Sequence, residues 1–260
     1  MGKRGIMIMG HGSTMAFNRA VMELHVGILR QKGFDNIYIG YNEASDPLIS
    51  VALEGMVADG IDEILCLPFF IASGLHMTRD IPAKLGIPGN VSEVTSEVNG
   101  KKIKIHFEEP FGKDPLLTDI LRRKIEELDE GIEKTGVMIM GHGSKLQYNR
   151  EVMQFHADAL RGMGHDACIG FNEMNRPTID ESLEAMLDNG IDHVIALPLF
   201  IALGKHLTMD VPPRLHLRPG ADRGTHEHKG RQVIISYAHP IGSDRRLSDL
   251  LEAKIRKHYG

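Results

Sequence analysis

The sequence predicts an α/β protein of two tandem domains, each a small parallel sheet flanked by helices. One observation is the alternation of stretches of helical periodicity with continuous apolar runs, which are typical of strands covered on both faces of a sheet. The other is a repeat. Between Gly40 and Pro82, 21 of 43 residues match the segment from Gly170 to Pro212 without a gap. A repeat of this length indicates two copies of one folding unit, related by pseudo-two-fold symmetry.

Chain length and charge narrow the class of protein. The 260 residues divide into domains 1–130 and 131–260, with the boundary in the charged link from Glu126 to Gly136. The formal charge of −5 comes from interspersed acidic and basic residues, which argues against nucleic acid as a partner. The N-terminus lacks the apolar core and cleavage site of a signal peptide, so we expect a cytoplasmic protein that does not engage a membrane.

The pattern of the first half places its elements in order. After the first apolar strand comes a helix with Val21, Leu24 and Ile28 on one face, and Gly33 ends it. A second strand follows, and then a helix that starts at Pro47. We expect strands at residues 6–9, 37–40, 64–70 and 104–107, and helices at residues 17–32, 47–60, from 76 onward and at 114–128.

The second half repeats this order, with strands at residues 137–140, 194–200 and 233–237 and helices at 148–162 and 244–257. Residues 88–102 and 218–232 are polar and lack periodicity, so we expect exposed loops there. Cys66 and Cys168 lie in apolar runs at unmatched positions of the two copies, which favours buried, reduced thiols over a disulfide.

Four histidines stand at equivalent positions of the two halves. His11 and His142 occur in Gly-His-Gly-Ser after the first strand of each half, and His76 and His206 occur in Gly-x-His after the third. Because ligands bind outside the carboxyl ends of parallel strands, we expect each pair to line one crevice. Two neutral imidazoles suit Co²⁺, Ni²⁺, Fe²⁺ or Zn²⁺, and one would also accept a proton near neutral pH. The alternative is histidines held in loops by backbone hydrogen bonds, which the repetition disfavours.

Other polar residues allow two interpretations each. Backbone N–H groups near Ser13 and Ser144 could hold an anion, or the serines could cap the next helix. His25 and His156 lie on the apolar face of that helix, where packing in the core or between the halves is the simpler role. The run from Thr225 to His228 could scavenge metal weakly, although a solvated loop is the safer interpretation.

The two halves differ near these strand ends. An Asn-Glu pair at 42–43 and 172–173 follows the second strand of each half. In the first half, a carboxylate at Glu43 or Asp46 could accept or relay a proton. Arg176, at the position equivalent to Asp46, could instead pair with a substrate carboxylate. Helix capping is the alternative for each of these residues. The other differences are Leu75 against Lys205 and Glu109 against His239.

The order of these motifs resembles the CbiX-type sirohydrochlorin chelatases. Gly-His-Gly-Ser is followed about 65 residues later by Pro-hydrophobic-Phe-x-x-x-Gly-x-His-x-Thr-x-Asp-hydrophobic-Pro, and a Glu-Pro-Phe-Gly-x-Asp segment ends the first half. The resemblance covers nearly all of both halves. It implies a class II chelatase fold and insertion of Co²⁺ or Ni²⁺ into sirohydrochlorin, in cobalamin or coenzyme F430 synthesis, without an organic cofactor. The short form of that family works as a homodimer, so this chain resembles two fused short forms, an arrangement compatible with a monomer.

The resemblance also implies roles for individual residues. His11 and His142 would accept protons and bind metal, with His76 and His206 as second metal ligands. Metallation removes the pyrrole protons and transfers a partly desolvated metal, and neutral histidine can serve both steps. Arg176 departs from the acidic residue common at its position. The residues expected to contact substrate are Asp46, Ile71, Ala72, Ser73, Gly74, Leu75, His76, Arg176, Ile201, Ala202, Leu203, Gly204, Lys205 and His206.

Two alternative functions remain open at the level of sequence. Histidine phosphatases and mutases also place His-Gly after a first strand, but they put Arg directly before that histidine, where this chain has Gly10 and Gly141. A metal or tetrapyrrole carrier without catalysis is compatible with the same repeat. Assay of metal insertion separates these functions.

Overall fold

The computed structural model describes residues 2–74, 76–89, 91–204 and 206–260, with residues 16 and 76 described by their backbone alone. Leu75 and Lys205, both expected to contact substrate, lie outside the described residues. The chain forms two compact units. Unit 1 comprises Met1–Gly112 and Ser243–Gly260, and unit 2 comprises Lys113–Gly242.

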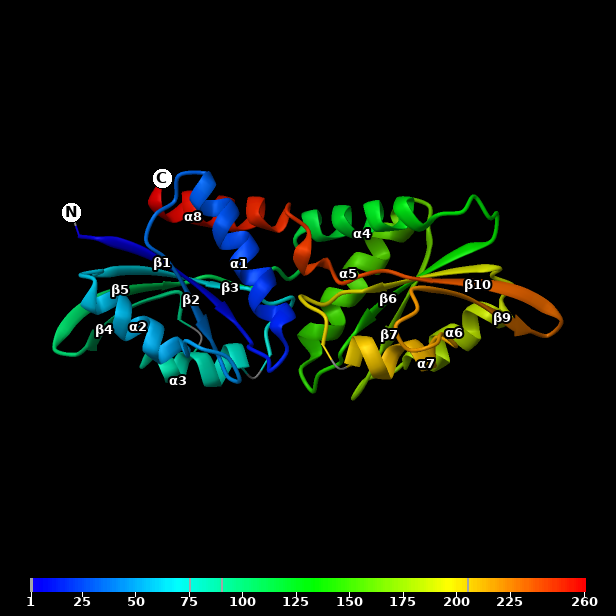
Figure 1. Cartoon of the computed structure of the whole chain (residues 1–260), viewed down its shortest axis with the longest axis horizontal. Helices are drawn as coiled ribbons and strands as arrows, with labels where there is room; N and C mark the ends of the chain where they lie inside the picture. Colours follow the sequence, from blue (N-terminus) through cyan, green and yellow to red (C-terminus); the bar gives the residue numbers. More distant parts are fainter. Residues whose placement is uncertain (1, 75, 90, 205) are drawn as a thin grey trace. The chain divides into compact units, whose positions relative to one another are not determined.

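Each unit alternates strands and helices (Figure 1). The elements of unit 1 are β1 (Arg4–Gly10), α1 (Ala16–Gln31), β2 (Ile37–Tyr41), α2 (Ile49–Ala58), β3 (Glu63–Pro68), the π-helical turn η1 (His76–Asp80), α3 (Ile81–Leu85), β4 (Glu93–Val98), β5 (Lys101–Phe107) and α8 (Leu247–Tyr259). The elements of unit 2 are α4 (Pro115–Leu128), β6 (Thr135–Gly141), α5 (Gln147–Gly162), β7 (Asp166–Phe171), α6 (Ile179–Asp188), β8 (His193–Pro198), the π-helical turn η2 (His206–Asp210), α7 (Val211–Arg214), β9 (Arg223–His228) and β10 (Arg231–Tyr237). A short 3₁₀ turn, η3 (Ile241–Ser243), precedes α8.

Both sheets have five strands in the same order, β2-β1-β3-β5-β4 in unit 1 and β7-β6-β8-β10-β9 in unit 2. Four strands of each sheet are parallel, and the edge strands β4 and β9 run antiparallel to their neighbours. The predicted architecture, two tandem domains that are each a mostly parallel sheet flanked by helices, is confirmed. Because β1 pairs in parallel with both β2 and β3, the carboxyl ends of β1 and β3 lie side by side, and these are the strand ends that His11 and His76 follow in the sequence.

The prediction of loops at residues 88–102 and 218–232 was wrong, because those segments contain β4 and β9. Along β4 exposed residues alternate with half-buried ones, and β9 follows the same pattern up to its last residue. An edge strand with little apolar surface gives a weak strand pattern in the sequence. Each edge strand forms because it pairs with a buried neighbour, β5 or β10, although its own residues are mostly polar.

Each sheet buries one face under the helices that follow its second and third strands. In unit 1, Met7 and Cys66 of the strands pack with Leu53 of α2 in one core cluster. In unit 2, Met138 packs with Leu183 of α6 in the equivalent cluster. Figure 1 shows α1 and α8 on the other face in unit 1, and α4 and α5 on the other face in unit 2. Both cysteines are free, as expected, and burial raises their pKa to about 12.

The compact units do not coincide with the linear halves 1–130 and 131–260, because the closing helix of each half packs with the other half's sheet. Helix α4, from the first half, belongs to unit 2, and α8, from the second half, belongs to unit 1. The buried face of α4 includes Leu117, Leu121 and Ile125. An amphipathic pattern specifies which face of a helix is buried but not which sheet covers it.

No helix within the described part of the chain is both long and apolar enough to cross a membrane.

Candidate functional site

Two histidines and a carboxylate converge at the carboxyl end of the sheet in unit 2. One nitrogen each of His142 and His206 and a carboxylate oxygen of Glu173 lie within 4.8 Å of one another. The imidazole rings of the two histidines have centroids 5.0 Å apart and stand at 79° to each other. The expected convergence of His142 and His206 is therefore observed. A set of three nitrogen and oxygen ligands that is partly open to solvent leaves a coordination position for a substrate.

Asp210 fixes the orientation of His206. Nδ1 of His206 lies 2.7 Å from Oδ2 of Asp210, which stands one turn later in η2. The same nitrogen lies 3.7 Å from Oε1 of Glu173. When Nδ1–H donates to the Asp210 carboxylate, Nε2 keeps the lone pair that binds a metal, an arrangement common to metal-binding histidines.

The loop after β6 brings His142 against the loop after β7. The amide of Glu173 donates to the carbonyl oxygen of His142 over 2.9 Å, so the two strand ends are tied by backbone. Between them Gly143 has φ of +96°, and a Cβ on it would lie 1.9 Å from the carbonyl oxygen of Glu173. The second glycine of Gly-His-Gly is thus required by a left-handed backbone and by a close approach.

Unit 1 repeats this arrangement with His11 and Glu43. The amide of Glu43 donates to the carbonyl oxygen of His11 over 3.0 Å. A Cβ on Gly12 would lie 1.6 Å from the carbonyl oxygen of Glu43. Nε2 of His11 lies 3.5 Å from Oε1 of Glu43, and both side chains are about half exposed. The side chain of His76 lies outside the described residues, so the pairing of His11 with His76 stays a prediction.

In the repeated Asn-Glu pair, the asparagine has a structural role and the glutamate belongs to the site. Asn42 is almost fully buried, and its Oδ1 accepts from Nζ of Lys84 in α3 over 2.8 Å. Asn172 is anchored in the same way by Nη1 of Arg214 in α7, at 3.1 Å from Oδ1. The asparagine of each pair is thus held by a cationic side chain, while the next residue, Glu43 or Glu173, lies within 4 Å of a histidine of its site.

The Gly-x-His-x-Thr motif is a hydrogen-bonded turn. The hydroxyl of Thr78 donates to the carbonyl oxygen of Gly74 over 3.2 Å, and that of Thr208 to Gly204 over 3.1 Å. This bond fixes the start of η1 and η2, where His76 and His206 stand. The glycine and threonine of the motif therefore form a turn that holds the backbone of the histidine between them.

The segments expected to line the macrocycle, residues 71–74 and 201–204, are half-buried in both units. Each is held at its first residue by a glycine of the segment after the last strand. The amide of Gly112 donates to the carbonyl oxygen of Ile71 over 2.7 Å. A Cβ on Gly242 would lie 1.5 Å from the carbonyl oxygen of Ile201. The Glu-Pro-Phe-Gly segment thus supports the lining segment.

Arg176 and Asp46 are both exposed, and Arg176 has an intramolecular partner. Its guanidinium pairs with Glu181 in the first turn of α6, and 81% of its side chain is exposed. Glu181 also completes a capping box with Thr178. The geometry favours a role for Arg176 at the start of the helix. Contact of Asp46 or Arg176 with substrate stays a prediction.

The amides near Ser13 and Ser144 already have partners. The amide of Ser13 donates to Oγ of Ser45 over 3.0 Å, and that of Ser144 to Oδ1 of Asn175 over 2.6 Å. Each serine hydroxyl accepts from the amide two residues later, ahead of the helix. Both serines therefore stabilise turns, and neither is an N-cap. Anion binding at these loops stays a prediction.

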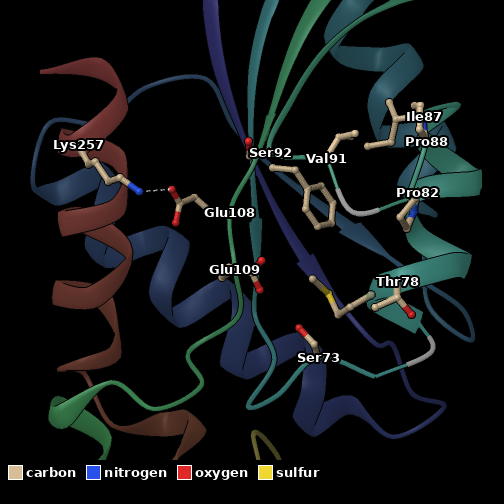
Figure 2. A pocket seen from close by; sticks show the side chains of 12 residues that line it. Ser73, Thr78, Pro82, Ile87, Pro88, Val91, Ser92, Glu108, Glu109 and Lys257 are labelled. Atoms are coloured by element: carbon tan, nitrogen blue, oxygen red, sulfur yellow. Dashed lines mark hydrogen bonds and ion pairs between the residues drawn. The ribbon is translucent and has the colours of Figure 1, made fainter. Parts of the chain in front are cut away.

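A cavity of about 490 Å³ opens in unit 1 beside the Gly-x-His segment (Figure 2). Ser73 and Thr78 line one end, and Glu108, Glu109 and Lys257 are its charged lining residues. Nζ of Lys257 donates to Oε1 of Glu108 over 2.9 Å, as Figure 2 shows. A cavity lined by two carboxylates and one ammonium does not favour a ligand rich in carboxylates.

Glu108 attaches α8 to the end of β5. Besides Lys257, its carboxylate accepts from Nε2 of His258 over 2.7 Å and from Nζ of Lys254 over 3.2 Å. Burial alone would raise the pKa of Glu108, but the hydrogen bonds from His258 and Lys257 and the charge of Lys254 outweigh it and lower the pKa to about 2. The equivalent position in unit 2 is Ala238, so the two units differ in how the exchanged helix is fixed.

Glu43 was named from the sequence as a candidate proton acceptor, but the equivalent Glu173, and also Asp210, were missed as members of the site in unit 2. A signal for each is present: Asn-Glu follows the second strand of both halves, and an aspartate follows each Gly-x-His histidine by four residues. Such spacing places the histidine and the aspartate on one face of a helical turn. Only the fold shows that Glu173 reaches the histidines, since that contact depends on the loop at Gly143.

Comparison with known proteins agrees with this architecture. The model of the CbiX family matches residues 5–128 and again residues 136–258. A sirohydrochlorin cobaltochelatase of Methanosarcina barkeri is 37% identical over 127 residues, which are 48% of this chain and 97% of that protein. A second one, of Methanosarcina acetivorans, is 35% identical over the same shares of the two chains.

Solved structures show the same fold over the whole chain. SirB from Bacillus subtilis with Fe³⁺ aligns with a TM-score of 0.74 and 17% identity, covering 98% of this chain and 95% of that one. A sirohydrochlorin chelatase SirB from Bacillus subtilis subspecies spizizenii, in complex with cobalt, aligns with a TM-score of 0.69, 17% identity and coverage of 98% and 94%. With two matches to the family model, one in each half, this chain belongs to the CbiX family.

Proposed function

We propose that this protein is a chelatase that inserts Co²⁺ or Ni²⁺ into sirohydrochlorin. The observation that carries the proposal is the cluster of His142, Glu173 and His206, with its ligand atoms within 4.8 Å of one another. Family membership and relatives named sirohydrochlorin cobaltochelatases support the substrate. Imidazole and carboxylate ligands suit both metals, and cobalt has the additional support of the relatives' names.

The metal substrate would bind to Nε2 of His206 and to the Glu173 carboxylate. Asp210, at 2.7 Å from Nδ1 of His206, holds the imidazole in the tautomer that this requires. A site with few protein ligands keeps the metal partly hydrated, so its remaining positions can be exchanged for the ring nitrogens of the tetrapyrrole.

His142 would accept the pyrrole protons. Its ring lies 5.0 Å from that of His206, so a macrocycle whose metal is held by His206 brings its nitrogens near His142. Neutral imidazole is a suitable base near neutral pH. His11 and Glu43 would form the corresponding half-site of unit 1, with His76 as the second histidine. No organic cofactor enters this mechanism, and we expect the chain to act in the cytoplasm as a monomer.

The test is metallation of sirohydrochlorin by the purified chain. With Co²⁺, and separately with Ni²⁺, the visible spectrum should change faster than in the spontaneous reaction. A chain that binds cobalt and the tetrapyrrole without accelerating metallation would instead be a carrier. Absence of both acceleration and binding would refute the proposal.

A further inference from the structure

We propose that unit 2 has a second divalent-metal site, formed by Glu184, Asp188 and His228. It lies at the end of the sheet opposite to the cluster of His142, Glu173 and His206, called the chelatase cluster below. One carboxylate oxygen of each acidic residue and one imidazole nitrogen of His228 lie within 4.8 Å of one another. A set of one nitrogen and two carboxylate ligands suits Zn²⁺, Co²⁺ or Ni²⁺. The sequence alone favoured a solvated loop at residues 225–228, and the structure replaces that loop with a strand.

Two adjacent elements build this site. Glu184 and Asp188 stand one turn apart in α6, so their carboxylates share one face of the helix. His228 ends β9, and its imidazole is almost buried, with 9% of the side chain exposed and Nε2 at 2.8 Å from Oδ1 of Asp188. The histidine is therefore positioned before any ion binds, and only the exposed carboxylates need to adjust.

The strand start next to the site is also fixed. Arg231, paired with His228 in the β9–β10 ladder, donates from Nη2 to the carbonyl oxygen of Leu187 in α6 over 2.6 Å. This bond joins the hairpin to the helix that carries the carboxylates. Ligands on elements joined in this way keep their spacing better than ligands on a free loop.

Further histidines lie beside the proposed ligands. His226 is two residues before His228, on the same face of β9, and their ring centroids are 6.4 Å apart. The ring of His226 stacks on that of His216, with centroids 3.8 Å apart and planes at 6°. Three imidazoles therefore lie close together on this part of unit 2.

The duplication supplies an internal comparison. At the positions equivalent to Asp188 and His228, unit 1 has Ala58 and Val98, and only Glu54 matches Glu184. The strands β4 and β9 nevertheless pair in the same register with β5 and β10. The acid and histidine pair is thus not needed to form the hairpin.

Lys229 occupies one side of the site. Its Nζ lies 2.5 Å from Oδ1 of Asp188, the oxygen that also pairs with His228, and 68% of its side chain is exposed. A divalent ion would displace this exposed ammonium. The proposal therefore predicts that removal of the lysine charge, as in Lys229→Met, tightens metal binding, whereas a purely structural ion pair predicts loss of stability alone.

The test is Zn²⁺ binding to the full chain, followed by calorimetric titration and by anomalous diffraction from soaked crystals. We expect an anomalous peak between the side chains of Glu184, Asp188 and His228, and at least about tenfold weaker binding at this site in Glu184→Gln and in His228→Ala. Glu54→Gln in unit 1 is the matched control and should bind as the unchanged chain does.

Glu184 is exposed, so Glu184→Gln should keep the fold even if His228→Ala does not. It should also keep the rate of sirohydrochlorin metallation, which separates this site from the chelatase cluster. Unchanged zinc affinity in Glu184→Gln, or a soaked crystal without a peak at the three side chains, would overturn the proposal.

Discussion

Nδ1 of His25 lies 2.7 Å from Oγ of Ser248, although 223 positions separate the two residues in the chain. The relationship recurs in unit 2, where Nδ1 of His156 lies 2.8 Å from Oγ1 of Thr118. Both histidines are fully buried, as their place on an apolar helix face predicted. In each unit the histidine belongs to the helix after the first strand, and the hydroxyl belongs to the exchanged helix.

Thr118→Val should destabilise unit 2, because it keeps the shape of the side chain but removes the hydrogen bond to buried His156. A buried polar atom deprived of its partner costs about 1–3 kcal/mol. The measurement is the free energy of unfolding from urea denaturation. Thr118→Ser, which installs the residue of unit 1 and keeps a hydroxyl, should lose clearly less. Equal losses in the two variants would show that packing of the methyl group, not the hydrogen bond, matters here.

Acid should loosen the attachment of α8 through Glu108. The lowered pKa of about 2 means that the carboxylate stabilises the folded state fully above the usual value of 4.5. That stabilisation, up to about 3 kcal/mol, is lost as pH falls from about 4.5 toward 2. Glu108→Gln should remove this part of the dependence of unfolding free energy on pH, and Lys257→Met should reduce it in part. An identical pH profile for Glu108→Gln and the unchanged chain would contradict the assignment.

Gly143→Ala should lower cobalt affinity and stability by more than the cost of its left-handed backbone angle alone. Gly164 provides a matched control, because its φ of +95° nearly equals the +96° of Gly143, but a Cβ on it meets nothing within 4 Å. Both variants carry the cost of a left-handed alanine, about 1–2 kcal/mol. Only Gly143→Ala also brings a methyl group against the carbonyl oxygen of Glu173, at 1.9 Å without relaxation. Cobalt affinity and unfolding free energy should fall further in Gly143→Ala than in Gly164→Ala, and equal losses would contradict the steric argument.

Most of the fold could be predicted because buried parallel strands and amphipathic helices leave strong patterns. The edge strands β4 and β9 could not, since their exposed positions carry polar residues such as Glu97 and Glu227. The packing of α4 and α8 on the sheet of the other half could not be predicted either, because the apolar face of a helix does not specify which sheet it packs against. In the site, repetition and spacing pointed to the histidines. The repeated Asn-Glu pair marked the position of Glu173, but its contact with the histidines depends on backbone geometry at Gly143, which the sequence does not show.

Replacing His11 and His142 together by alanine should abolish metallation of sirohydrochlorin while the fold is retained. Each is the proposed proton acceptor of its half, and no equivalent base remains in the proposed mechanism. The initial rate with Co²⁺ is the measurement, with circular dichroism as the check on folding. If the half-sites act independently, each single variant should keep about half the activity. Full activity in the double variant would refute the assigned role of both histidines.

Glu173→Gln isolates the metal-binding contribution of the carboxylate when the first half is silenced by His11→Ala. Glutamine keeps the size of the side chain but removes the negative charge that offsets the divalent ion. In this background we expect at least about tenfold weaker Co²⁺ binding and a correspondingly lower rate at subsaturating cobalt, with recovery as cobalt is raised. Glu133→Gln in the same background is the control, because it removes an exposed carboxylate of unit 2 that belongs to neither metal cluster. If Glu173→Gln and Glu133→Gln gave the same rates at low cobalt, Glu173 would not be a ligand of the substrate metal.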